Sequence, residues 1–134
     1  MIVNGVYDRL GKLTGEDKEK YKGIPTGFGL LDTYITGLNK SDFILIGARP
    51  AMGKTSFALN LASNVSMMAR KKCVFFSLEM TKEQLAERLL ASQAGVPSHK
   101  LRTGELDNDE WVRLGNAAGQ FNDVELYLDD TSSI

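Results

Sequence analysis

The sequence has a single cysteine, Cys73, and a single histidine, His99, among its 134 residues. One cysteine excludes an internal disulfide, and its place in the apolar stretch Cys73–Phe76 is typical of a small buried hydrophobic residue in a reducing cytoplasm. His99 lies in a polar stretch with neither a nearby cysteine nor an evident acidic partner. The sequence therefore favours neither a disulfide framework nor a metal or catalytic centre built on histidine.

Long apolar runs and an excess of charge are also lacking. No stretch approaches the roughly 18 apolar residues of a membrane span, and the first residues lack the order of a signal peptide. With 16 basic and 17 acidic residues, the chain has no overall positive field for nucleic acid, so any such contact must be local or lie elsewhere. These absences predict a cytoplasmic protein with no membrane partner.

The first 22 residues have a pattern different from that of the rest of the chain. Apolar residues recur at helical spacing in residues 1–13, which predicts a short amphipathic helix. Residues 14–22 are polar and rich in lysine and predict a flexible linker, which would leave the apolar stripe of the helix without a partner. Packing of the helix onto its own domain is the alternative. Residues 23–134 suffice for a single domain.

Strands and helices are expected to alternate after residue 23. The expected strands are residues 43–46, 73–78 and 124–128. The first is a continuous apolar run and the second begins with one at residues 73–76, as is typical of buried strands. Thr81 with Gln84 predicts a capping box, and Asp107 predicts the cap of a later helix. Trp111 opens an apolar stripe on that helix, which favours core or interface packing over base stacking. The alternation implies an α/β fold with a parallel sheet.

A phosphate-binding motif follows the first expected strand. It reads Ala48, Arg49, Pro50, Ala51, Met52, Gly53, Lys54, Thr55 and leads into a helix at Ser56. Backbone N–H groups of such a loop surround a β-phosphate, Lys54 is the expected cation beside it, and the Thr55 hydroxyl is the expected Mg²⁺ ligand. Ala48 stands where the usual pattern has glycine. The motif predicts binding of ATP and Mg²⁺, and an ordinary strand–turn–helix is the alternative.

Carboxylates follow the other expected strands. Glu79 lies at the carboxyl end of the second one, where a carboxylate could deprotonate an attacking water or simply begin a solvent-facing loop. Asp129 and Asp130 end the third one. They match a strand that ends in a Mg²⁺-binding aspartate, but Asp130 also matches the cap of a following helix. The residues alone leave these alternatives open.

Several segments, in the same order along the chain, resemble the DnaB-type replicative DNA helicases. They are Gly23–Phe28, Ala48–Asn60, Phe76–Met80, Leu101–Gly104 and Leu126–Thr131. The likeness covers nearly the whole chain, and the first helix looks like the linker helix between the two domains of that family. The resemblance implies a RecA-like P-loop NTPase core with a mainly parallel sheet. Residues 23–134 would be the first part of that ATPase domain, with a sheet incomplete at its C-terminal side.

The resemblance also implies a function. Such a protein works as a homo-hexamer that uses ATP and Mg²⁺ to move along single-stranded DNA and separate the strands, with primase and a helicase loader as partners. By matching positions, Lys54 and Thr55 carry the phosphate-loop roles and Glu79 is the glutamate that activates water. In the family, the metal-binding aspartate belongs to the next strand, so Asp129 and Asp130 lose that role.

The resemblance places the metal-binding aspartate and the arginine finger beyond Ile134, so we expect the isolated chain to bind nucleotide weakly and to hydrolyse it negligibly. The rival interpretation is another RecA-like ATPase, such as a recombinase or a KaiC-like protein, because Gly27, Leu31 and Asp32 also suit those families. A nucleotide-binding assembly module without catalysis is the other alternative.

Overall fold

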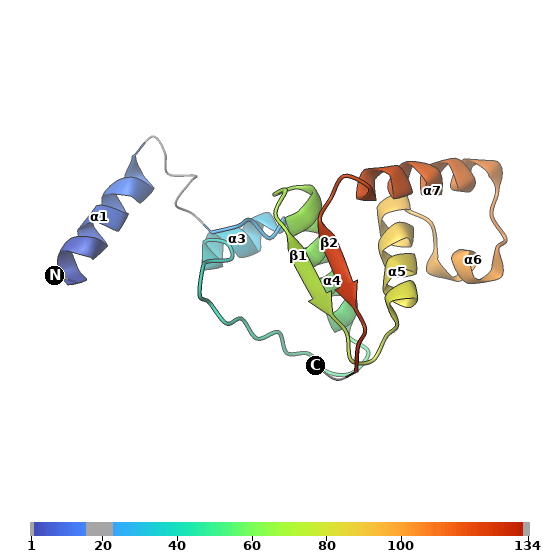
Figure 1. Ribbon diagram of the computed structural model, residues 1–134, viewed down its shortest axis with the longest axis horizontal. Helices are drawn as coiled ribbons and strands as arrows, with labels where there is room; N and C mark the ends of the chain where they lie inside the picture. Colours follow the sequence, from blue (N-terminus) through green and yellow to red (C-terminus); the bar gives the residue numbers. More distant parts are fainter. Residues whose placement is uncertain (1, 16–22, 133–134) are drawn as a thin grey trace. The chain divides into compact units, whose positions relative to one another are not determined.

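The computed structural model of the chain describes residues 2–15 and 23–132. Contacts divide the chain into compact units of residues 1–45 and 46–134. The first unit holds helices α1 and α3, and the second holds a β-sheet with helices α4 to α7 (Figure 1). Most of the predicted linker, residues 16–22, lies outside the described residues. None of the helices within the described ranges is long and apolar enough to cross a membrane.

Helix α1 (Ile2–Thr14) begins the first unit and has the amphipathic pattern that the sequence predicts. The side chains of its apolar stripe are accessible to solvent. Val3, Val6, Tyr7 and Leu10 expose 55%, 52%, 71% and 50% of their surface. The stripe is therefore available for contact with another surface.

Residues 23–42 fold around the short helix α3 (Gly29–Ile35). Ile24 and Leu38 form an isolated antiparallel bridge with N···O distances of 2.9 and 2.7 Å. The backbone N–H and the hydroxyl of buried Thr26 both donate to Asp32 Oδ1, at 2.9 and 2.7 Å. These bonds satisfy a buried hydroxyl and fix the start of α3 to the bridge.

The buried strand predicted at residues 43–46 is not formed. These residues have no regular secondary structure, and Phe43 and Leu45 expose 89% and 83% of their surface. A strand is stable only when a neighbouring strand pairs with its backbone N–H and C=O groups. Within the described part of the chain, the sheet contains only β1 and β2, which pair with each other. The apolar run is thus present without the partner that would make it a strand.

The sheet of the second unit pairs β1 (Cys73–Phe76) with β2 (Leu126–Asp129) in parallel. The register places Cys73 opposite Leu126 and Phe76 opposite Asp129. This pairing, with helices before and between the strands, confirms the α/β class and the parallel sheet that the sequence predicts. The sheet is short and is not closed.

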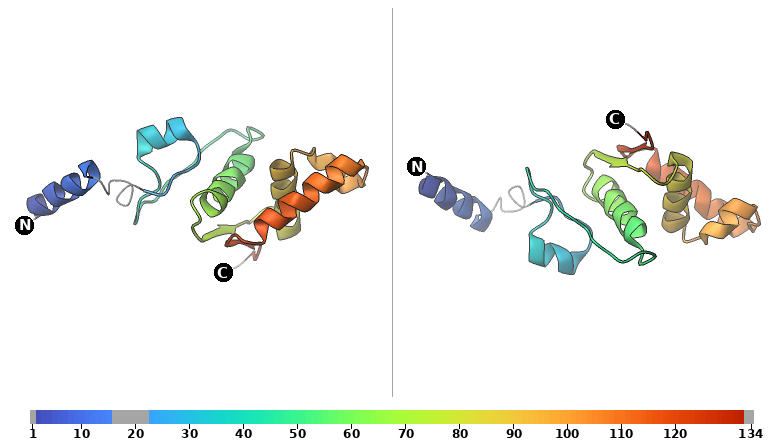
Figure 2. Two further views of the ribbon diagram at one scale, coloured as in Figure 1. Left: turned by 90° about the horizontal axis from the view of Figure 1, so that it is seen from above. Right: turned by 90° about the horizontal axis from the view of Figure 1, so that it is seen from below.

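Helices α4 and α5 pack against one face of this sheet. The helices of the unit are α4 (Lys54–Met67), α5 (Lys82–Ala94), α6 (Ser98–Thr103) and α7 (Asn108–Phe121). Buried Leu59, Leu85 and Leu89 form a core against the sheet residues Phe75, Leu126 and Leu128. A second cluster, Ala94, Val96 and Ala117, joins α5 to α7. Both views of Figure 2 show α5, α6 and α7 lying together.

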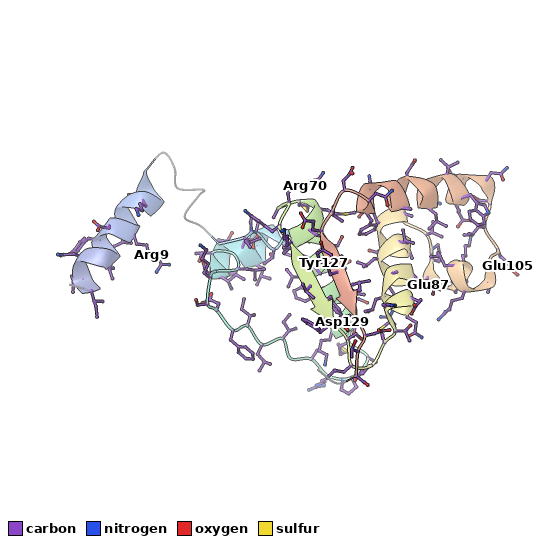
Figure 3. The ribbon with its side chains drawn as sticks, in the orientation of Figure 1. Arg9, Arg70, Glu87, Glu105, Tyr127 and Asp129 are labelled. Atoms are coloured by element: carbon purple, nitrogen blue, oxygen red, sulfur yellow. The ribbon has the colours of Figure 1, made fainter. Side chains whose placement is uncertain are left out.

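The other face of the sheet is open. Val74 and Phe76 expose 52% and 59% of their surface, and Tyr127, labelled in Figure 3, exposes 55%. Of the buried strand predicted at residues 73–78, only residues 73–76 form a strand, and its burial was a wrong prediction for one of the two faces, because no described helix of the second unit packs there. On the covered side, burial raises the pKa of the Cys73 thiol, as expected for a small hydrophobic residue.

The local helix signals are confirmed. Thr81 with Gln84 forms the predicted capping box of α5, and Asp107 with Glu110 forms one at the start of α7. Core packing of Trp111 was a wrong prediction, since this side chain is 59% exposed. The reason is that α7 packs through the face that carries Glu110 and Ala117. An interface role of Trp111 stays a prediction.

A partly buried ion pair ties α6 to α7. Lys100 Nζ donates to both carboxylate oxygens of Glu110 at 2.9 Å, and the Glu110 side chain is only 4% exposed. Glu110 Oε1 also accepts a hydrogen bond from the N–H of Asp107 at 3.1 Å. The hydrogen bonds from Lys100 and Asp107 lower the pKa of Glu110.

Stability should depend on pH through this pair. Because the folded-state pKa of Glu110 is lowered, the pair stabilises the fold above the ordinary glutamate pKa of about 4.3. This contribution is lost as the pH falls through the lowered value. Glu110→Gln keeps a side-chain oxygen for the capping box but loses the charge. We expect its free energy of unfolding, measured in urea between about pH 7 and about pH 3, to change less than that of the unmodified chain.

Asp109→Asn is the matched control for this experiment. Asp109 is 79% exposed beside Arg113, and an exposed ion pair contributes at most about 1 kcal/mol. The pH dependence of this variant should resemble that of the unmodified chain. An equal loss of pH dependence in both variants would contradict the assignment to Glu110.

Candidate phosphate-binding site

The predicted phosphate-binding loop, residues 48–55, leads directly into α4. Gly53 is the N-cap of this helix with φ 84°, and Ala51 also has a positive φ of 64°. Left-handed residues in a loop turn neighbouring N–H groups toward one side, which makes a concave cradle for an anion. Glycine adopts this conformation freely, whereas it costs alanine about 1–2 kcal/mol. Strain of this kind at Ala51 is typical of ligand-binding loops.

The start of α4 is suited to a negative charge. Its first turn contains no acidic residue, and Gly53 has no side chain that could cap the first N–H groups. These groups and the positive end of the helix dipole are therefore available to a ligand. Lys54 is exposed and Thr55 is half-buried at the same place. N–H groups, an ammonium and a hydroxyl together fit a phosphate group.

The same residues fit a magnesium ion that is carried by phosphates. Within residues 2–15 and 23–132, no group of at least three His, Cys, Asp or Glu side chains could hold a metal ion. Mg²⁺ is commonly bound through substrate phosphates, waters and only one or two protein ligands. The hydroxyl of Thr55 is a suitable protein ligand for an ion held in this way.

Glu79 lies in the loop of residues 77–81 that joins β1 to α5. Figure 1 shows the ends of β1 and β2 at the edge of the sheet where α4 begins. Glu79 is exposed, and the following Met80 packs against the core formed by Leu59, Leu85 and Leu89. The structure thus brings Glu79 and the phosphate-binding loop to the same edge, where ligands gather in open α/β sheets.

The aspartates at the end of β2, Asp129 and Asp130, make contacts that the sequence did not indicate. Asp130 Oδ2 accepts a hydrogen bond from the N–H of Lys82 at 2.9 Å, so Asp130 caps α5, which precedes it in the chain. Asp129 Oδ1 accepts a hydrogen bond from the N–H of Thr131 at 2.8 Å. The hydrogen bonds from the side chain and from the backbone of Thr131, with the charge of Lys82, lower the pKa of Asp129. Figure 3 shows Asp129 at the end of β2.

The contact between Lys82 and Asp130 joins residues that are 48 positions apart. Sequence patterns carry information on neighbours within a few residues, so no local signal could have revealed it. Capping was the correct chemistry for Asp130, but the sequence predicted it for a helix that would follow.

A cleft of about 680 Å³ lies between α4, α5 and α6. Of the predicted phosphate-binding residues only Ser56 lines it, together with Arg88 and Arg102. Residues 48–54 are instead exposed at the surface. The phosphate-binding loop is therefore an open surface feature and is separate from this cleft.

Comparison with known proteins identifies the family. The family model described as "DnaB-like helicase C terminal domain" matches residues 23–134 of the sequence. The chain belongs to this family. A replicative DNA helicase DnaB of Geobacillus stearothermophilus is 42% identical over 133 residues, which are 99% of this chain and 29% of that protein. DnaB of a Nostoc species is 45% identical over 112 residues, 84% of this chain and 13% of that protein. The chain thus spans less than a third of these curated relatives.

Solved structures of related proteins share the fold. One of them, an ATPase domain, superposes with a TM-score of 0.84 at 29% identity, covering 98% of this chain and 45% of that one. The structure of a DnaB-like replicative helicase, studied with its interactions with primase, superposes with a TM-score of 0.83 at 31% identity. The match covers 97% of this chain and 31% of that one. This likeness supports the RecA-like class of ATPase core that the sequence resemblance implied.

Gly53→Ala should weaken nucleotide binding. The φ of 84° at this position is strained for alanine by about 1–2 kcal/mol, although a Cβ would meet no atom within 4 Å. A loop that relaxes to relieve this strain no longer directs its N–H groups at a phosphate. We expect the affinity for a fluorescent ATP analogue, measured by titration, to fall about tenfold.

Gly104→Ala is a matched control. Gly104 ends α6 with φ 75°, and a Cβ there also meets no atom within 4 Å. This variant should lose a similar free energy of unfolding while keeping its affinity for the nucleotide. If Gly104→Ala loses as much nucleotide affinity as Gly53→Ala, general destabilisation of the fold explains the loss, and the loop before α4 has no special role in it.

Proposed function

We propose that the chain is the nucleotide-binding part of a replicative DNA helicase motor. In this proposal the complete protein is a ring of six subunits that uses ATP and Mg²⁺ to move along single-stranded DNA and to separate the strands. The observation that carries the proposal is the loop that ends in left-handed Gly53 at the start of α4, in a member of the DnaB-like helicase C-terminal domain family.

The proposed roles follow from the positions of the residues. The backbone of residues 48–53 and the first N–H groups of α4 hold the β-phosphate, as in a Walker A motif. Lys54 pairs with the β- and γ-phosphates, and the hydroxyl of Thr55 binds Mg²⁺. Glu79, at the same edge of the sheet, accepts a proton from the attacking water.

Primase is a proposed partner, supported by the similar helicase structure that was studied with its primase interactions. A helicase loader is proposed from the family resemblance alone. Both would act within the primosome and not on an isolated subunit.

Substitutions at Lys54 and Glu79 should separate binding from hydrolysis. The test uses a hybrid helicase in which this chain replaces the matching segment of the Geobacillus stearothermophilus relative. Lys54→Ala removes a charged hydrogen-bond donor, so its affinity for ATP should fall about 10- to 100-fold. Glu79→Gln keeps the shape of the side chain but cannot take a proton. Its ATP affinity should stay within about twofold while DNA-stimulated turnover falls at least about 100-fold.

Unwinding of forked DNA by the unsubstituted hybrid distinguishes a helicase from a recombinase or a KaiC-like ATPase. A hybrid that forms hexamers and hydrolyses ATP but does not unwind DNA would contradict the helicase proposal. Full turnover by Glu79→Gln would contradict the role of Glu79 alone.

The accessible stripe of α1 is proposed to contact a neighbouring subunit in the ring. A head-to-tail contact of this kind closes into a ring when the same surfaces are used by every subunit. We expect light scattering to show concentration-dependent association of the chain. Val6→Lys, in the middle of the stripe, should reduce it, whereas Asp8→Lys, a change on the polar side, should not. A strictly monomeric chain at high concentration would contradict this contact.

A further inference from the structure

The loop that carries Glu79 is fixed at its first end by β2 and by its own side chain. The N–H of Ser77 donates to the carbonyl of Asp129 at 2.8 Å, which extends the strand pairing by one residue. Ser77 is buried, and its hydroxyl accepts a hydrogen bond from the N–H of Met80 at 3.0 Å. The side chain of Ser77 therefore closes the turn across Glu79.

The second end of the loop is fixed by α5 and by the segment after β2. The N–H of Thr81 donates to Gln84 Oε1 at 3.0 Å, as part of the capping box. The next N–H, of Lys82, donates to Asp130 Oδ2 at 2.9 Å. This contact ties the start of α5 to the end of β2. Leu78 and Glu79 are left as the exposed tip of a loop with fixed ends.

We propose that Asp130 and Ser77 are positioning residues for Glu79. The inference rests on the proposed function, in which the Glu79 carboxylate orients and deprotonates water. Ser77 binds the backbone N–H of Met80 from before the tip, and Asp130 binds that of Lys82 after it, so they restrict the path of the backbone from which Glu79 extends. A displacement of about 1 Å in a catalytic group can reduce a rate about 100-fold.

The fold itself depends little on Asp130. Its hydrogen bond to Lys82 is exposed to solvent, where water can replace the lost acceptor. Helix α5 is held instead by Leu85 and Leu89 in the core. Asp130→Ala should therefore fold and bind ATP, which makes its effect on turnover informative.

The first test measures turnover and ATP affinity in the hybrid helicase. For Asp130→Ala we expect DNA-stimulated turnover to fall about tenfold or more while KM for ATP changes less than about twofold. Asp130→Asn should restore most of the turnover, because its amide oxygen can still accept the hydrogen bond from Lys82. Asp123→Ala, which removes an exposed carboxylate before β2, should have no effect.

The second test measures amide hydrogen exchange in this 134-residue chain itself and not in the hybrid helicase. Asp130→Ala should speed exchange at Lys82 and Met80 by about tenfold or more without changing that of α7. Ser77→Ala should do the same at Met80 through the other end of the loop. These effects report the order of the loop without any requirement for activity.

The outcomes separate this inference from the proposed function. If Glu79→Gln is inactive while Asp130→Ala keeps full turnover, the positioning role is wrong and the proposed function stands. If Asp130→Asn is as impaired as Asp130→Ala, the hydrogen bond is not the cause and the positioning role is also wrong. If Glu79→Gln keeps full turnover, Glu79 has no catalytic role and Asp130 is only a helix cap.

Discussion

Leu85 is fully buried where α5 meets α4 and the paired strands, and the arrangement of the second unit depends on this packing. With Leu59 and Leu89 it holds both helices on one face of the sheet. Burial of one such side chain is worth about 1.5–3 kcal/mol, more than an exposed hydrogen bond at the sheet edge contributes. The core therefore determines where the helices lie. Hydrogen bonds such as that between Lys82 and Asp130 only refine the positions of residues at the sheet edge.

Binding and hydrolysis of a nucleotide would depend on this structure in different ways. The groups proposed to bind phosphate lie within residues 48–55, so they are close in the sequence and need only left-handed residues and the start of a helix. Glu79 reaches the same edge only because α4 packs against the sheet through the core of Leu59, Leu85 and Leu89. A change in the core could therefore impair hydrolysis while leaving the local cradle for phosphate intact.

The features that sequence reasoning could predict were local ones. The capping box of Thr81 is formed within one helical turn, and the α/β class follows from alternating patterns that span a few residues each. The apolar run at residues 43–46 was expected to be a strand, but strand formation requires a partner that the pattern cannot supply. Trp111 has the spacing of a core residue, and only the packing of α7 shows that it faces outward. The contact between Asp130 and Lys82 could not be predicted, because the two residues are 48 positions apart in the sequence.

The crossover between β1 and β2 has a consequence for the order in which the unit folds. Residues 77–125 separate the strands and contain α5, α6 and α7, whose mutual contacts span short distances in the chain. Local contacts close small loops at a low entropic cost, whereas pairing of the strands must close the whole crossover. Because the loop of Glu79 is fixed to both strands, the edge proposed to act on ATP is completed only after this long closure. In this order, helices α5, α6 and α7 form first and support the rest of the unit. The sheet edge that carries Glu79 forms last.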